Sequence, residues 1–87
     1  MIDSSIVAAL AWGETQGELL RDARGGWSRK KLAEMTTAQG YPCSSRNIER
    51  LEQGLAVTVP TATLQAILRA RGKGLEAIYP GKILVTA

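Results

Sequence analysis

The stretch CSSRNIERLEQG, residues 43–54, has the form of one complete short helix with both of its ends. The serines near its start are good N-cap residues, and the glycine at its end suits the left-handed residue that closes a helix. At 100° per residue, Ile48 and Leu51 share one face, and a helix is predicted over about residues 44–53. The opposite face carries Arg46, Arg50 and Gln53, with Glu49 at its edge.

The residues before this stretch predict three more helical segments. The first covers DSSIVAALAW, residues 3–12, with Asp3 or Ser4 as cap, and we expect a bend or break near Gly13 and Gly17. The second runs over about 15–24 and ends at the two glycines that follow. The third begins after Ser28 in WSRKKLAEM, and Gly40 and Pro42 stop it. The predicted inward residues of the last two are Leu19, Leu20, Ala23, Leu32, Ala33 and Met35.

The residues after the stretch predict an extended connector and two helices. Pro60 suits the first turn of a helix, and Leu64, Ile67 and Leu68 give that helix an apolar stripe that ends at Gly72. GLEAIY, residues 74–79, predicts a short final helix, and KILVT, residues 82–86, predicts a strand or an extended tail.

Composition and charge restrict the class of protein. The chain has 87 residues, which suits one domain, and no apolar run is long enough to span a bilayer. Its single cysteine, Cys43, cannot form an internal disulfide, so we expect the cytoplasm. There is no histidine, no phosphate-binding glycine loop and no zinc-ligand spacing, so we expect no enzyme, no metal and no cofactor. Residues 24–50 contain six basic and two acidic side chains, and positive charge of this kind attracts phosphate backbones.

Two short helices joined by a turn, the second with a basic outer face, predict a helix-turn-helix unit. The first helix of such a unit lies across the DNA backbone, where its N-terminal N–H groups can hold a phosphate, and the second lies in the major groove. The sequence resembles the lambda-repressor-like (xenobiotic-response-element type) helix-turn-helix family, in the long-turn form of actinobacterial and phage regulators. The segments that carry the resemblance are residues 19–35, 44–54, 59–72 and 75–80.

The resemblance implies five short helices. Together with the segments outside it, we expect an all-α fold of five or six helices with a possible short C-terminal strand or extended tail. The resemblance covers about residues 15–80, the expected DNA-binding domain. Outside it, the residues themselves predict an N-terminal helical extension at 1–14 and an extended tail or strand at 81–87. The resemblance also implies a sequence-specific transcriptional regulator, expected to be a repressor, with double-stranded DNA as partner. The residues that it implies contact DNA bases or phosphates are Arg29, Ser45, Arg46, Asn47, Arg50 and Gln53. We expect Ser28, beside Arg29, to contact the DNA backbone as well.

The sequence departs from the family pattern at two places. The turn TTAQGYPCS, residues 36–44, is about four residues longer than usual, which leaves the angle between the two helices open. Arg71 and Lys73 stand where the family has aliphatic residues, so they either alter the packing there or add positive charge near DNA.

Simpler interpretations stand beside these. Arg46 and Arg50 would share an exposed side on any helix, and they could pair with Glu49 or Glu52. We expect Cys43 to be a small, half-buried residue. Trp12 is expected either to pack in the core or to form part of an interface, and Trp27 is expected to be a hydrophobic staple or a core residue. The alternative function is an antitoxin-like interaction module of the same fold, which would bind a partner protein or a second copy through the C-terminal tail as well as DNA. An exposed Trp12 and an unpaired KILVT edge would favour it.

Overall fold

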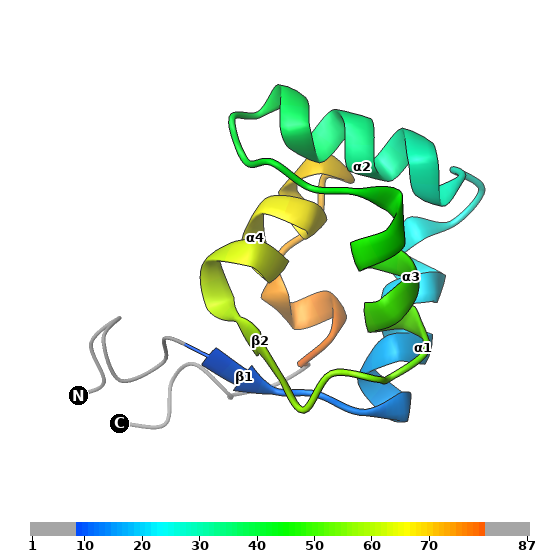
Figure 1. Ribbon diagram of the computed structural model, residues 1–87, viewed down its shortest axis with the longest axis vertical. Coiled ribbons are helices and arrows are strands. Elements are labelled where there is room, and N and C mark those ends of the chain that lie inside the picture. The colour runs from blue at the N-terminus through cyan, green and yellow to red at the C-terminus, as the bar shows by residue number, and fades with distance from the viewer. Residues whose placement is uncertain (1–8, 80–87) are drawn as a thin grey trace.

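The computed structural model describes residues 9–79, which form four α-helices and, at one end of them, a short two-stranded sheet (Figure 1). A strand leads into the first two helices: β1 (Ala9–Ala11), α1 (Glu14–Arg24) and α2 (Arg29–Ala38). The helix predicted from CSSRNIERLEQG follows as α3 (Ser45–Glu52), one residue shorter at each end than expected. The chain continues through β2 (Thr58–Pro60), α4 (Thr61–Ala70) and a single 3-10 turn, η1 (Leu75–Ala77).

The predicted all-α fold of five or six helices is wrong, because the described residues combine four α-helices with an antiparallel sheet. Leu10 pairs with Val59 at the centre of that sheet, and both side chains are buried. A helix over residues 3–12 would not place Ala9–Ala11 beside the extended connector, whose backbone groups need partners. GLEAIY forms only the turn η1, not a fifth helix. Residues 3–8 of the predicted first helix and the predicted tail at 81–87 lie outside the described residues.

The core lies where the four helices and the inner face of the sheet meet. In Figure 1, α2 lies at the top, α1 and α3 at the right, α4 near the centre and the sheet at the lower end. Helix α3 contacts both α1 and α2, and α4 contacts α2, β2 and η1. The largest fully buried side chains are mostly aliphatic and come from every one of these helices: Leu20, Leu32, Ile48, Leu64, Ile67, Leu68, Ile78, Val59 and Thr36.

Helix α1 differs from its prediction at Gly17. We expected a bend or break near Gly13 and Gly17. The helix begins directly after Gly13, as expected, but it continues without a break through Gly17 from Glu14 to Arg24. A Cβ atom at Gly17 would lie 2.7 Å from the carbonyl oxygen of Leu51 and closer still to that of Glu52. The glycine therefore allows α1 to pass directly against the end of α3, and this contact compensates for its low helix propensity.

Helix α2 places its inward residues almost as predicted. Leu32 and Ala33 are buried, but Met35 is 40% exposed, so its predicted place in the core is wrong. The next residue, Thr36, is buried instead, and its hydroxyl donates a hydrogen bond to the Leu32 carbonyl oxygen at 2.8 Å. This bond satisfies the polar group of a side chain that sequence hydrophobicity alone would place outside.

The helix ends follow local sequence signals. Ser28 and Ser44 cap α2 and α3, since each hydroxyl accepts a hydrogen bond from the backbone N–H three residues later. Gly25 and Gly54 adopt positive φ values of 63° and 71° after α1 and α3. None of the helices among residues 9–79 is long and apolar enough to cross a membrane.

Candidate nucleic-acid interface

The outward face of α3 gathers four of the predicted DNA contacts. Ser45, Arg46 and Arg50 are exposed, and Asn47 is half-buried beside them. The Ser44 hydroxyl accepts a hydrogen bond from the Asn47 N–H at 3.1 Å, which satisfies one N–H of the first turn. Together Ser44, Arg46, Asn47 and Arg50 line a shallow depression on the surface. Arg46, Asn47 and Arg50 thus lie together at the surface, and the contact of these side chains with DNA stays a prediction.

Packing of the inward face of α3 on the core fixes the position of the helix and therefore of its outward side chains. Ile48 has no exposed surface, and Leu51 is 4% exposed within the shared core. The indole Nε1 of Trp12 donates a hydrogen bond to the Leu51 carbonyl oxygen at 2.7 Å. Trp12 is itself 7% exposed, so it is a packing residue and no exposed interface. The end of α3 is therefore attached to the segment before α1 as well as to the helices around it.

Glu52 is the centre of a buried ionic cluster that the sequence analysis did not predict. Its carboxylate is fully buried, and Arg24 from α1 binds it in a bidentate manner, at 2.6 Å through Nε and 3.0 Å through Nη2. Arg29 from α2 binds the same carboxylate through Nε at 3.0 Å. Arg21 lies farther away, with Nε 4.0 Å from Oε1. One carboxylate at the end of α3 thus links three helices.

The charge state of Glu52 follows from these contacts. Burial acts to raise the pKa of its carboxyl group, but hydrogen bonds and positive charge from Arg24 and Arg29 outweigh burial and leave the pKa below its ordinary value of 4.5. A signal for this cluster was present in the sequence, because Glu52 lies four residues after Ile48 and shares its helix face. A carboxylate on an apolar face requires a cationic partner, and the sequence does not say which arginine supplies it.

Arg29 occupies the predicted position at the start of α2, but it is not a free cation. Its Nε is committed to Glu52, and its Nη1 lies 3.8 Å from a carboxylate oxygen of Glu49. The side chain remains 33% exposed. Ser28 is exposed and caps α2 through the Lys31 N–H at 3.0 Å, and Gln53 is exposed at the C-cap of α3.

Arg46 and Arg50 differ from Arg29 in this respect. Among residues 9–79, neither forms an ion pair with a carboxylate. The two acids that could have neutralised them, Glu49 and Glu52, instead face Arg29 and the buried cluster. The alternative in which these two arginines pair with the acids of their own helix is therefore wrong for the described structure.

Trp27 and Arg71 form a separate contact behind α2. The Arg71 guanidinium carbon lies 4.4 Å from the centroid of the indole ring, and the Lys31 ammonium nitrogen lies 4.6 Å from it. Arg71 also donates a hydrogen bond from Nε to the Arg24 carbonyl oxygen at 3.0 Å. Of the two predicted roles for Arg71, altered packing is the one that the structure supports, because its guanidinium group lies over the Trp27 ring and bonds to Arg24 within the domain.

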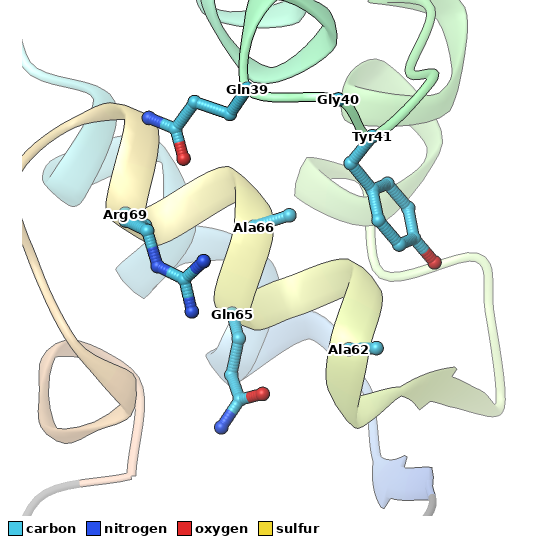
Figure 2. Close-up of a pocket in the computed structure, with 7 residues that line it drawn as sticks. All are labelled: Gln39, Gly40, Tyr41, Ala62, Gln65, Ala66 and Arg69. Carbon is cyan, nitrogen blue, oxygen red and sulfur yellow. The ribbon is translucent and has the colours of Figure 1, made fainter.

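A second surface hollow lies between the α2–α3 loop and α4 (Figure 2). Its volume is about 220 Å³, and Ala62 and Ala66 form the part that belongs to one turn of α4. Figure 2 shows the Gln39, Gln65 and Arg69 side chains extending around it and the Tyr41 ring beside it. The Tyr41 hydroxyl shares a hydrogen bond of 2.6 Å with the Thr63 hydroxyl, so its oxygen is already in use. The lining residues offer hydrogen bonds and one positive charge but no carboxylate or nucleophile.

Two other side chains with titratable groups, Cys43 and Tyr79, are partly buried in the fold. Cys43 is half-buried, and burial raises the pKa of its thiol more than the hydrogen bond with Asn47 lowers it, which disfavours the thiolate. Tyr79 is half-buried, its hydroxyl donates to the Ala11 carbonyl oxygen, and burial raises its pKa. Within residues 9–79, no three histidine, cysteine or acidic side chains are placed to hold a metal ion.

Comparisons with known proteins give no independent assignment. No protein-family model, no curated protein and no solved structure matches the chain. The function must therefore be argued from the described residues themselves.

Proposed function

We propose that this chain is a sequence-specific DNA-binding protein that regulates transcription, with α3 as the helix that enters the major groove. The observation that carries the proposal is the state of Arg46 and Arg50. Both are exposed on one face of a helix whose opposite face is fully buried, and both lack carboxylate partners in the described part of the chain. Unpaired cations on a rigid helix are what a phosphate-lined groove requires.

The dimensions and chemistry of α3 suit base recognition. The major groove of B-DNA is about 12 Å wide and admits one α-helix. An arginine that binds guanine O6 and N7 through two hydrogen bonds discriminates against other bases by roughly 1–3 kcal/mol. We assign that role to Arg46 and Arg50, and we assign further base or phosphate contacts to Ser45 and Asn47.

The start of α2 and the end of α3 supply candidate contacts to the DNA backbone. Ser28 and Gln53 are exposed at these helix ends, where hydroxyl, amide and backbone N–H groups can hold phosphate oxygens. Arg29 can add a phosphate contact only through its Nη groups, because its Nε is bound to Glu52. Its main role in our proposal is to hold α2 against α3.

The unit α2–loop–α3 is the part of the proposed helix-turn-helix resemblance that matters for function. The loop of residues 39–44 leaves both helices packed on the same core, and α2 contacts both α3 and α4. We place repression ahead of activation, because a domain that occupies a promoter blocks polymerase without any further contact. We also propose the cytoplasm, where bacterial and phage DNA is found.

The antitoxin-like alternative loses one of its two supports. Trp12 is buried and bonded to Leu51, so it offers no surface to a partner. The KILVT segment, residues 82–86, lies outside the described residues. DNA binding without an obligatory protein partner is therefore the function that the described residues favour.

The test is a selection of binding sites from random-sequence duplex DNA, followed by titrations of the selected site and of its single-base variants. We expect Arg46→Ala to lower affinity for the selected site by about 1–3 kcal/mol and to relax base preference at one position. Arg69→Ala is the matched control, since Arg69 is an exposed arginine on α4. Failure to enrich any sequence would refute the proposal, and so would equal effects of the two substitutions at every site.

A further inference from the structure

The hollow between the α2–α3 loop and α4 has the dimensions of a site for a small molecule. Its volume is about 220 Å³. A cavity of about 150 Å³ holds one benzene ring, so this hollow has room for a six-membered ring with a short polar substituent. Drug-sized ligands occupy larger clefts, of roughly 300–1,000 Å³. The hollow therefore suits an occupant of about ten non-hydrogen atoms.

Small residues keep this hollow open. Ala62 and Ala66 lie four positions apart, so their methyl groups share one face of α4. Gly40 lines the hollow from the loop, with a φ of 92° that residues with a Cβ atom rarely adopt. The two methyl groups and the Tyr41 ring beside them form an apolar surface that suits a flat ring (Figure 2).

Hydrogen bonds hold the loop side of the hollow in place. The Tyr41 hydroxyl shares its hydrogen bond of 2.6 Å with Thr63 of α4, which connects the loop directly to that helix. The Thr37 hydroxyl donates to the Cys43 carbonyl oxygen and accepts from the Cys43 N–H, both at 3.1 Å. The Gly40 N–H donates to the Thr37 carbonyl oxygen at 2.9 Å. Because these contacts already order the loop, a ligand would bind at a low cost in conformational entropy.

Three polar side chains around the hollow have unused hydrogen-bonding groups. Gln39 comes from the end of α2, and Gln65 and Arg69 lie four positions apart on α4. Within residues 9–79, none of these three side chains forms a hydrogen bond or an ion pair. Figure 2 shows all three extending around the hollow. Arg69 is the one charged residue of the lining, and its planar guanidinium group matches a carboxylate through two parallel N–H donors.

We propose that this hollow binds a small aromatic carboxylate. The carboxylate of the ligand pairs with the Arg69 guanidinium group, and its ring lies on the Ala62 and Ala66 methyl groups. The amides of Gln39 and Gln65 form hydrogen bonds at the polar edge of the ligand. None of these residues belongs to the proposed DNA contacts, so the ligand site does not depend on the proposed function.

The experiment is a titration of the isotope-labelled full chain with sodium benzoate, without DNA and at constant ionic strength, followed by backbone amide NMR spectra. A molecule of this size in a partly open site binds weakly, so we expect half-saturation at about 1–10 mM. The largest shifts should occur at Gly40, Tyr41, Gln65 and Ala66, which line the hollow. Benzamide has the ring without the charge, and acetate has the charge without the ring. Each should bind at least about fivefold more weakly than benzoate.

Two variants test the assigned contacts. Arg69→Gln removes the positive charge of the lining, and Ala62→Leu fills the hollow from an exposed position on α4. Each should raise the half-saturation concentration for benzoate at least about fivefold. Lys30→Ala is the matched control, because it removes an exposed positive charge of α2 outside the hollow, and it should bind benzoate like the wild type. The same spectra establish that each variant is folded.

The absence of localised shifts up to about 50 mM benzoate overturns the proposal. Shifts centred on α3 overturn it too, because benzoate would then be a general counter-ion of the basic surface. Equal binding of benzamide and benzoate, or of Arg69→Gln and the wild type, contradicts the pairing with Arg69. The proposed function fails in a different way, by absence of DNA enrichment, which leaves this titration valid.

Discussion

Replacing Glu52 by glutamine tests whether the buried ionic cluster holds α3 in position. The substitution keeps the size of the side chain but removes the charge that Arg24 and Arg29 share. One carboxylate oxygen becomes an NH2 group that faces guanidinium donors, so at least one of the hydrogen bonds at 2.6–3.0 Å is lost. Arg24 then retains its charge near the core without a counter-charge, and Arg29 retains only the Glu49 carboxylate at 3.8 Å.

The expected loss of unfolding free energy in Glu52→Gln is large for a domain of this size. Removal of one partner from a buried pair destabilises a protein by about 3–5 kcal/mol. We expect the lower end, about 3 kcal/mol, because Arg24 keeps its hydrogen bond to the Trp27 carbonyl oxygen and Arg29 is 33% exposed to water. For a domain of 60–100 residues, a loss of 3 kcal/mol corresponds to a fall in Tm of about 12–24 °C.

The assay is urea unfolding followed by circular dichroism, with thermal unfolding as a second measurement. Glu49→Gln is the matched control, since its side chain is 46% exposed and lies 3.8 Å from Arg29. An exposed pair of this kind contributes about 0–1 kcal/mol. The reasoning is refuted if Glu52→Gln stays within about 0.5 kcal/mol of the wild type, or if the two substitutions have the same effect.

The same cluster predicts a dependence of stability on pH. The pKa of Glu52 is lower in the folded chain than its ordinary value of 4.5, so the ionised carboxylate stabilises the fold fully above that value. This contribution is lost as the pH falls below 4.5 and through the lower pKa of the folded state. The difference in unfolding free energy between the wild type and Glu52→Gln should therefore shrink in acid. A constant difference across that range would contradict the assigned charge state.

Two further predictions concern the packing of the end of α3 against α1 and against the residue Trp12 that precedes α1. Gly17→Ala should destabilise the chain by about 1–3 kcal/mol in urea unfolding, despite the better helix propensity of alanine, because its Cβ would overlap the carbonyl oxygens at the end of α3. Gly26→Ala, with no atom within 4 Å of its Cβ, is the control, and a stabilising Gly17→Ala would show that the close approach is absent. Trp12→Phe should cost about 1 kcal/mol by loss of the hydrogen bond to Leu51, measured by circular dichroism, and an unchanged stability would mean that water replaces it.

Local chemistry determined the limits of most helices. Ser28 and Ser44 cap α2 and α3 because a serine hydroxyl reaches the N–H three residues later whatever the rest of the chain does. Gly54 ends α3 because a left-handed residue without a Cβ is needed there. The burial of Ile48 and Leu51 followed from helical periodicity, and the exposure of Arg46 and Arg50 followed from it as well.

Interactions between distant segments decided the rest. Residues Ala9–Ala11 have high helix propensity, yet they form a strand, because β2 supplies backbone hydrogen-bond partners and the Leu10 side chain is buried in the core. Gly17 remains helical because the end of α3 packs against it, and Glu52 is buried because arginines from α1 and α2 reach it. A single sequence states each residue's own preferences, whereas burial, pairing and compensation of charge depend on which remote residues the fold brings within a few ångströms.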